Sequence, residues 1–205
     1  FEKRLLSLES IVKNREYLGS DDINYQSIFA SEPGAIASPT ASLHFEQSVL
    51  TNLKEIGVHF SFLTLHVGAG TFLPVKSQNI SEHKMHDERG KLGKKTADEI
   101  NRTKAEGGRI IPVGTTSLRL LESAAISHNR VAEFNGKTNI FIRPGYKFRV
   151  TDGLITNFHF PKSTLLMLIS ALVGNDERKK IYTHAVEKQY RFFSYGDSSL
   201  LLPKI

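Results

Sequence analysis

Apolar residues recur along this chain with two spacings, one that suits helices and one that suits strands. Helical spacing, with apolar residues three and four positions apart, marks four segments: residues 46–56, 95–105, 117–126 and 176–189. Shorter runs rich in β-branched and aromatic residues predict strands over residues 58–67, 109–113, 139–143, 147–150 and 154–158. Residues 76–93 are polar and are predicted to form a long loop. Because strands and helices alternate, the pattern favours an α/β domain with a mostly parallel sheet.

The stretch from Ile155 to Ser170 predicts a strand end, a polar turn and then a helix. Ser163 or Thr164 can cap this helix, because a hydroxyl oxygen accepts a hydrogen bond from the N–H groups that a helix start leaves unpaired. Residues 165–173 are apolar on every face, which predicts a buried helix too short to cross a bilayer. A rigid buried helix therefore holds a turn that contains an amide and an imidazole.

Composition narrows the possible chemistry. The 205 residues contain no cysteine, which excludes disulfides, zinc–thiolate sites and thiol catalysis. The apolar fraction of 40% is enough for a packed core, and no signal peptide is apparent, so we expect a cytoplasmic protein. A net charge of +6 is consistent with a polyanionic partner such as nucleic acid, although many proteins are mildly basic.

Polar turns follow several of the predicted strands. The turns are Pro39–Phe45, His66–Phe72, Gly114–Arg119 and Asn157–Ser163. Since strand ends share one edge in a parallel α/β fold, we expect these distant turns to converge. Together they contribute His44, His66, Thr71, Thr115, Thr116, Arg119, Asn157 and His159. Neutral donors and imidazoles suit a polar, partly anionic ligand and proton transfer near neutral pH.

Several of these motifs also have plain structural interpretations. Gly68-Ala69-Gly70 lacks the third glycine of a dinucleotide fingerprint and the lysine of a P-loop, and alone it is more typical of a tight turn. Gly114-Thr115-Thr116 opens a helix, where the N–H groups can bind an anion or the threonines can simply cap. Arg119 can clamp a carboxylate or phosphate, or pair with Glu122 on the same helix.

His83, His86 and His159 also have more than one possible role. His83 and His86 do not have the spacing of a zinc protease, and no cysteine is available, so we expect no metal and favour a loop that places histidines over a substrate. His159 lies between Phe158 and Phe160, which is consistent with a core histidine. Asn157 nearby also allows a base with a shifted pKa.

Seven ordered sequence blocks match a known family. They are residues 39–45, 65–72, 82–86, 113–123, 140–148, 156–167 and 190–197, which include Pro-Thr-Ala-Ser-Leu-His-Phe, Leu-His-Val-Gly-Ala-Gly-Thr-Phe and Thr-Asn-Phe-His-Phe-Pro-Lys-Ser-Thr-Leu-Leu-Met. Over residues 24–202 the chain closely resembles the S-adenosylmethionine:tRNA ribosyltransferase-isomerases of bacterial queuosine synthesis.

The resemblance implies an architecture. We expect an α/β catalytic domain over residues 21–205, with a mostly parallel sheet or an open barrel flanked by helices. The family's N-terminal part, including an inserted β-barrel domain, is expected to be missing here, with residues 1–20 an uncertain segment or a remnant of that region. Phe1 in place of a starting methionine is consistent with a fragment.

The resemblance also implies a reaction. The family moves the ribosyl portion of S-adenosylmethionine to 7-aminomethyl-7-deazaguanine at the tRNA wobble position, and adenine and methionine leave as the sugar becomes an epoxycyclopentanediol. S-adenosylmethionine is then a cosubstrate, no prosthetic group is expected, and the partner is the precursor tRNA. A monomer without membrane contact is expected.

Site roles follow from the resemblance and from side-chain chemistry. Proton-transfer candidates are His44, His66, His86 and His159. Cosubstrate-binding candidates are Gly68, Gly70, Thr71, Thr115, Thr116, Arg119 and Asn157, with Arg119 and the two threonines assigned to the methionine carboxylate. The modified base of the tRNA, turned out of its stack, is expected to pack on Phe45, Phe72 or Tyr146. The tRNA phosphates are expected to contact Lys147, Arg149, Lys162 and Arg191.

Two other function classes stay open from the residues alone. A basic module can bind tRNA without chemistry, and another S-adenosylmethionine-dependent enzyme can modify RNA. A methyltransferase is disfavoured, because no strand–GxGxG–helix element with a following acidic residue occurs. Free adenine marks the ribosyltransferase, S-adenosylhomocysteine marks the methyltransferase, and neither product marks the binding module.

Overall fold

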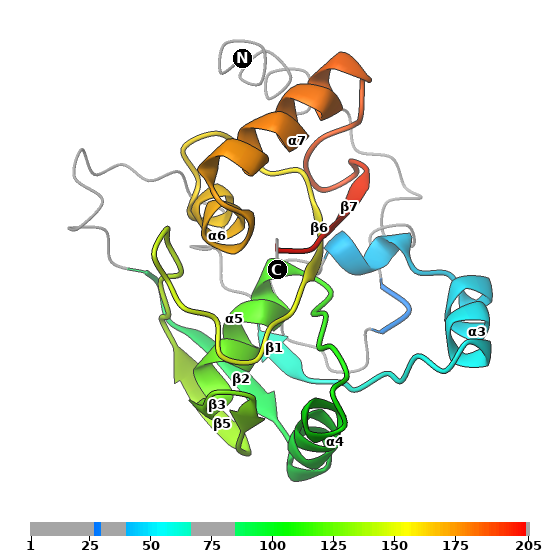
Figure 1. The fold of residues 1–205 in the computed structure, drawn as a ribbon, viewed down its shortest axis with the longest axis vertical. Helices are drawn as coiled ribbons and strands as arrows, with labels where there is room; N and C mark the ends of the chain where they lie inside the picture. The colour runs from blue at the N-terminus through cyan, green and yellow to red at the C-terminus, as the bar shows by residue number, and fades with distance from the viewer. Residues whose placement is uncertain (1–26, 30–39, 67–84, 204–205) are drawn as a thin grey trace.

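Five α-helices and seven strands make up the part of the chain that the computed structural model describes, which is residues 27–29, 40–66 and 85–203. Figure 1 shows α5 in the middle of the molecule, α6 and α7 toward one end, and α4 toward the other. The elements in chain order are η1 (Thr40–His44), α3 (Gln47–Glu55), β1 (Thr64–His66), β2 (Glu88–Leu92), α4 (Lys94–Ala105), α5 (Thr115–Ala124), β3 (Ala125–Ser127), β4 (Arg130–Val131), β5 (Phe134–Thr138), β6 (Leu154–Asn157), α6 (Thr164–Val173), α7 (Asn175–Glu187) and β7 (Ser198–Leu201). None of the described helices is long and apolar enough to cross a membrane.

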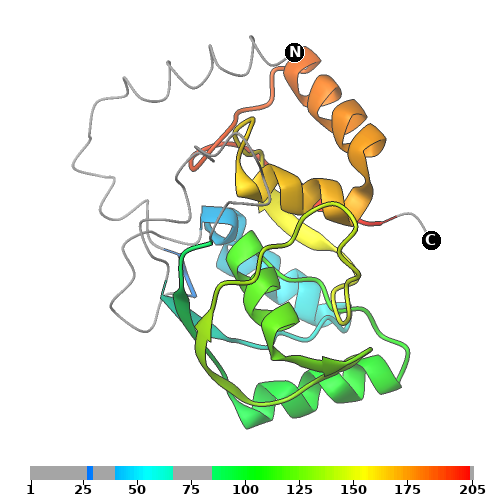
Figure 2. The ribbon, with the colours of Figure 1, turned by 90° about the vertical axis from the view of Figure 1, so that its left-hand side faces the viewer.

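Strands β1, β2 and β5 form an antiparallel sheet that packs against α5 (Figure 2). Along β2, the buried positions are Glu88, Gly90 and Leu92, which alternate with exposed Arg89 and Lys91. A Cβ atom on Gly90 would lie 2.7 Å from Leu120 Cδ1 of α5. The absence of a side chain at Gly90 therefore allows α5 to approach the sheet closely.

A second layer is built around β6, which pairs antiparallel with β7. Residues 110–114 run parallel beside β6, with a bridge between Val113 and Ile155. Ile155 N–H donates to Pro112 O at 3.0 Å, and Gly114 N–H donates to Ile155 O at 2.8 Å. Pro112 has no N–H to donate, so this parallel ladder stays incomplete.

The prediction of a mostly parallel sheet is wrong for the described residues. Every pair between named strands is antiparallel, and the Val113–Ile155 bridge is parallel. An open barrel is not confirmed either. Strand β2 lies within residues 76–93, which were predicted to form a loop. The strand was not recognised because two of its three inward positions are a glutamate and a glycine, so the usual alternation of apolar and polar residues is missing. The predicted strands over 139–143 and 147–150 are absent, and β5 and the β3–β4 hairpin form just before them.

The predicted helices are confirmed. Ser163 caps α6, since its Oγ accepts a hydrogen bond from Leu166 N at 3.1 Å. The inward face of α6 packs on α7 and on the aromatic residues of the neighbouring turn, in a core that includes Leu168, Ile169, Tyr182, Phe192 and Phe193. This packing fixes the turn between β6 and α6, where the sequence places an amide and an imidazole.

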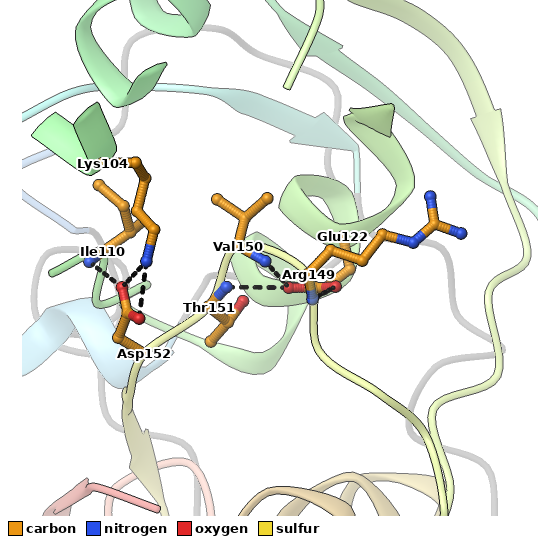
Figure 3. Close-up of polar contacts among 7 residues, drawn as sticks. All are labelled: Lys104, Ile110, Glu122, Arg149, Val150, Thr151 and Asp152. Carbon is orange, nitrogen blue, oxygen red and sulfur yellow. Dashed lines mark hydrogen bonds and ion pairs between the residues drawn. The ribbon is translucent and has the colours of Figure 1, made fainter. Parts of the chain in front are cut away.

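Two carboxylates, the buried Glu122 and the half-buried Asp152, hold the chain that leads into β6 (Figure 3). Glu122 of α5 is 2% exposed, and its carboxylate accepts from Arg149 N at 2.9 Å, Val150 N at 3.2 Å and Thr151 N at 3.0 Å. Asp152 accepts from Ile110 N at 2.7 Å and from Lys104 Nζ at 2.8 Å. The backbone N–H groups of residues 149–151 thus bind a side chain and not a neighbouring strand, which explains why no strand forms there.

Replacing Glu122 with Gln tests this attachment. Oε2 of Glu122 accepts from Arg149 N, and Oε1 accepts from Val150 N and Thr151 N. A glutamine has only one acceptor oxygen in place of these two, so at least one buried N–H loses its partner. We expect the free energy of unfolding to fall by about 2–3 kcal/mol. Urea denaturation measures it, with the exposed Glu187→Gln as matched control. A loss no larger than that of the control would show that the Glu122 contacts do not stabilise the fold.

Candidate functional site

Asn157, the last residue of β6, is the centre of a polar cluster drawn from three separate parts of the chain. Its side chain is 3% exposed. The Oδ1 atom accepts from Thr40 Oγ1 at 3.2 Å, and Nδ2 lies 3.2 Å from His44 Nε2 and 3.4 Å from Gly196 O. Thr40 and His44 belong to η1, which packs against β6. The β6 end, η1 and the 192–197 turn therefore meet at one amide.

These contacts define the hydrogen-bonding state of His44. The Gly196 carbonyl can only accept, so the nitrogen of the Asn157 amide must face it and also face His44. His44 Nε2 then accepts from Asn157, and the neutral ring carries its proton on Nδ1. His44 is exposed, so its Nδ1–H is accessible to a ligand. The cluster thus presents an oriented imidazole at the surface.

The turn that supplies Gly196 is held by an ion pair. Asp197 accepts from Arg191 N at 2.7 Å, from Nε at 3.1 Å and from Nη2 at 2.7 Å. The Arg191 hydrogen bonds hold the pKa of Asp197 below its ordinary value, desolvation opposes them, and the charge of His44 adds a smaller contribution in the same direction as Arg191. A Cβ on Gly196 would lie 2.4 Å from the Phe192 carbonyl carbon, so only glycine fits this turn.

The start of α5 lies beside the same cluster. Gly114 precedes α5 with a φ of 93°, a conformation that favours glycine, and a Cβ on it would be 3.9 Å from Ala41 Cβ of η1. Thr115 and Thr116 are buried directly after it. The turns around His44, Thr115 and Asn157 therefore converge, as predicted. The fourth turn continues past His66 into residues 67–84, outside the described residues.

Arg119 does not occupy the predicted position for a ligand carboxylate. It is 2% exposed, it pairs with Glu88 of β2, and its Nε donates to Ile140 O at 3.3 Å. The alternative pair with Glu122 does not form, because Glu122 faces residues 149–151. Arg119 Nη2 is buried without a hydrogen-bond partner in the described part of the chain. Arg119 thus connects α5 to the sheet.

His159 occupies an interior environment. Its Nε2 is 2.9 Å from Thr156 Oγ1, and its backbone N–H donates to Tyr182 Oη at 3.1 Å. Burial lowers the pKa of His159 to about 4, so the ring is neutral near pH 7. Adjacent residues of a strand point to opposite faces, so Thr156 and Asn157 engage His159 and His44 on opposite sides of β6. The interpretation of His159 as a core histidine is favoured.

The other predicted proton-transfer residues lie away from the Asn157 cluster, and several predicted cosubstrate residues fall outside the described residues. His66 is in β1, opposite Arg89 of β2, and His86 is exposed just before β2. His66 lies in the sheet and His86 lies next to it, and neither makes a contact of the Asn157 cluster. The predicted cosubstrate and stacking residues Gly68, Gly70, Thr71 and Phe72 fall outside the described residues.

Two aromatic residues that were predicted to stack on a base make contacts within the protein. Phe45 is 8% exposed and packs on Phe29, with ring centroids 5.7 Å apart. Tyr146 Oη donates to Glu122 at 3.1 Å, and desolvation and the Glu122 carboxylate raise the pKa of Tyr146 to about 12. The burial of Phe45 argues against its stacking on a flipped base, whereas Tyr146 is half-buried and its stacking stays a prediction.

The predicted phosphate-binding residues divide into free and engaged cations. Lys147 and Lys162 are exposed. Arg149 Nη1 donates to Ala125 O at 2.7 Å, and Arg191 is held by Asp197. Sequence reasoning missed Thr40, Gly196 and Asp197 as members of the cluster. The Tyr-Gly-Asp run was visible as part of a family block, but no residue type in it indicated contact with Asn157.

Comparisons with known proteins identify relatives of the chain. The sequence profile of a family described as queuosine biosynthesis protein matches residues 4–201. S-adenosylmethionine:tRNA ribosyltransferase-isomerases from Dinoroseobacter shibae and Ruegeria pomeroyi are 56% and 60% identical, over 94% and 89% of this chain and 55% and 52% of their own lengths. The crystal structure of S-adenosylmethionine tRNA ribosyltransferase from Thermotoga maritima superposes with a TM-score of 0.66 at 40% identity, covering 80% of this chain and 51% of that one. The chain thus spans about half the length of these relatives.

Replacing Asn157 with Asp should change the tautomer of His44. The carboxylate is isosteric but only accepts, so His44 Nε2 must carry a proton to contact it. In the parent protein, ¹⁵N NMR should show pyridine-type Nε2 and pyrrole-type Nδ1, and Nε2 should become protonated in the variant. The exposed Asn52→Asp is the control and should leave the His44 signals unchanged. Pyrrole-type Nε2 in the parent would contradict the assigned hydrogen bond.

The pKa of His159 predicts a pH-dependent loss of stability. Between about pH 6.5 and pH 4, the unfolded chain binds a proton at this residue and the folded chain does not. Stability should therefore fall as the pH falls through this range, by about 3 kcal/mol in total from this residue. In His159→Gln this part of the pH dependence should disappear, whereas the exposed His128→Gln should retain it. Identical pH profiles for parent and His159→Gln, measured by urea denaturation, would contradict the buried neutral state.

Proposed function

The chain belongs to the queuosine biosynthesis protein family, and we propose that the full-length protein is an S-adenosylmethionine:tRNA ribosyltransferase-isomerase. It transfers the ribosyl group of S-adenosylmethionine to 7-aminomethyl-7-deazaguanine at the tRNA wobble position and rearranges it to give epoxyqueuosine. The relatives' names support the reaction, and the convergence of His44, Asn157 and the start of α5 is the observation that supports its location.

The reaction places two demands on proton transfer. Three bonds form: a C–N bond to the aminomethyl group, a C–C bond between C1′ and C5′ that closes the cyclopentane ring, and a C–O bond that closes the epoxide. Three bonds break: the glycosidic C–N bond to adenine, the ribose C–O bond at C1′ and the C–S bond to methionine. The positive sulfonium acidifies the adjacent 5′ carbon, so a nearby base can remove a proton there. Adenine leaves more readily once it is protonated, which requires a donor.

His44 is the residue that we assign to this proton transfer. Asn157 Nδ2 donates to its ring and favours the neutral imidazole, whereas the Asp197 carboxylate lies close enough to interact with the charged imidazolium. The ring is exposed, unlike that of His159. Because Nε2 accepts from the Asn157 amide, the exposed Nδ1–H is the group that faces a ligand, and we assign it as the hydrogen-bond donor to the departing adenine.

The α5 start is proposed as the binding position for the methionine carboxylate, in place of Arg119. The first N–H groups of a helix have no partners within the helix and favour anions. The first turn of α5 contains no acidic residue that would compete. Thr115 and Thr116 lie in that turn, next to η1, and Gly68, Gly70 and Thr71 are proposed to complete the cosubstrate site.

Substrate RNA contacts are proposed at Lys147 and Lys162. Both lysines are exposed and form no ion pair with the described residues, so they can bind phosphates directly. Arg191 keeps a structural role in this proposal, because it holds Asp197 beside His44. A cytoplasmic monomer that uses S-adenosylmethionine as cosubstrate, without a prosthetic group, agrees with this function.

The decisive substitution is His44→Gln, which retains polar contacts but cannot carry a proton. We expect adenine release from S-adenosylmethionine in the presence of precursor tRNA to fall by about 10²–10⁴-fold. His128→Gln, an exposed histidine remote in sequence from the cluster, should stay within about two-fold.

Product analysis by chromatography separates the candidate functions. The proposal expects adenine and methionine from the parent protein. S-adenosylhomocysteine would identify a methyltransferase, and tRNA binding without either product would identify a binding module. Adenine release by His44→Gln equal to that of the control would remove His44 from the mechanism and leave the reaction itself standing.

A further inference from the structure

The outer face of the β1–β2–β5 sheet carries two rows of polar and basic side chains. The strand register places His66 opposite Arg89 and Arg89 opposite Lys137. The next row on the same face aligns Thr64 with Lys91 and Lys91 with Asn135. Cross-strand partners share a face of the sheet, and residues two apart on one strand do too, so the six side chains form one surface. We call it the basic sheet face.

This surface is set apart from the Asn157 cluster. The alternate residues of β2, Glu88, Gly90 and Leu92, are buried on the opposite face, and α5 packs there through Leu120. The sheet therefore separates the basic sheet face from α5, whose first turn lies beside η1 (Figure 2). A ligand on the basic sheet face is not in the Asn157 cluster.

The charges on this face are unfavourable for the isolated fold. Arg89 and Lys137 are like charges on directly opposed positions, which destabilises a sheet. The cations of this face are Arg89, Lys91 and Lys137. Among the described residues, their one ion pair joins Lys137 to Asp87 at 3.7 Å, and both of those side chains are at least half exposed. An exposed pair of this kind contributes little. The surface thus presents three exposed cationic side chains whose charges a polyanion would neutralise.

The shape of the surface also suits a nucleic acid. A groove of about 460 Å³ covers five of the six residues of this face, all except Lys137. Its lining includes Phe62, Thr64, His66, Arg89, Lys91 and Asn135. Phe62 lines the groove and is 61% exposed, although a large aromatic residue is normally buried. Cations that bind phosphates, next to an aromatic ring that can stack on a base or ribose, are the combination that single-stranded RNA requires.

We propose that the basic sheet face binds the sugar–phosphate backbone of the substrate RNA, away from the nucleotide that reacts. Arg89, Lys91 and Lys137 contact phosphates, and Phe62 packs against an unpaired nucleotide. The proposal rests on the proposed function, since tRNA is the polyanion that such an enzyme must hold. In addition to the RNA contacts proposed at Lys147 and Lys162, the enzyme would then have a second RNA-binding surface, on the face of the sheet opposite α5.

The test compares two triple variants with the same change in net charge. The first is Arg89→Gln, Lys91→Gln and Lys137→Gln, and the control is Lys179→Gln, Lys180→Gln and Lys188→Gln on and after α7, where all three lysines are exposed. Binding of an unmodified tRNA transcript is measured by filter retention of the full-length protein between 50 and 300 mM salt. Each lost phosphate contact should reduce the slope of log K against log salt by about 0.7–0.9, so the sheet variant should lose about two in slope.

The expected result is at least a ten-fold weaker tRNA affinity for the sheet variant at low salt, with the control within two-fold of the parent. Phe62→Ala should weaken binding without changing the salt slope. The sheet variant should melt no earlier than the parent, because removing Arg89 and Lys137 removes a like-charge contact. This thermal measurement distinguishes lost binding from lost folding, and the single variant Lys91→Gln should show part of the same effect.

Several results would overturn the proposal. Equal tRNA affinities and salt slopes for the sheet variant and the control would exclude this surface. A weaker affinity for S-adenosylmethionine with unchanged tRNA binding would assign the groove to the cosubstrate. Adenine release by the parent protein separates the two proposals. If the parent binds tRNA through this face but releases no adenine, the proposed reaction is contradicted and the proposed binding surface is retained. If the parent releases adenine and the sheet variant binds tRNA as well as the parent does, the binding surface is contradicted and the reaction is retained.

Discussion

One turn of α5 carries two buried charges that face in different directions, and the arrangement of the whole domain depends on them. Arg119 pairs with Glu88 and so attaches α5 to the antiparallel sheet. Glu122 accepts backbone hydrogen bonds from residues 149–151 and so attaches α5 to the chain that enters β6. Buried charges are costly unless they are paired and hydrogen-bonded. Satisfying both at once fixes α5 between the two layers, and its first turn beside η1.

The position of α5 decides what the polar turns can do. Since Gly114 donates to Ile155, the start of α5 lies next to the end of β6. The buried α6 follows β6 and fixes the turn after Asn157 from the other side. A single amide then contacts η1 and the 192–197 turn, and it holds His44 in one orientation. The site is thus a consequence of helix and strand packing, and not of any one contiguous motif.

Sequence patterns predicted this arrangement unevenly, for physical reasons. The amphipathic helices and the buried α6 follow from apolar spacing. The meeting of η1, α5 and β6 was expected from a parallel sheet, of which the described residues contain only the Val113–Ile155 bridge that places the start of α5 beside the end of β6. Strand β2 was missed, because its inward face carries Glu88 and Gly90 in place of apolar residues. Arg119 was assigned to a ligand carboxylate, but it is buried and paired with Glu88, because residue type does not reveal that a distant carboxylate already contacts the side chain. The basic sheet face was missed for a related reason, since its charges align only once the strand register is known.

The central claim is that the Asn157 cluster, with His44 and the first turn of α5, forms the reaction site of a ribosyltransferase-isomerase. A crystal structure of the full-length protein with S-adenosylmethionine tests it most directly. The account predicts the ribose within hydrogen-bonding distance of His44 and the methionine carboxylate at the N–H groups of Thr115 and Thr116. Electron density for the cosubstrate in the groove on the outer face of the sheet, with the Asn157 cluster empty, would contradict it.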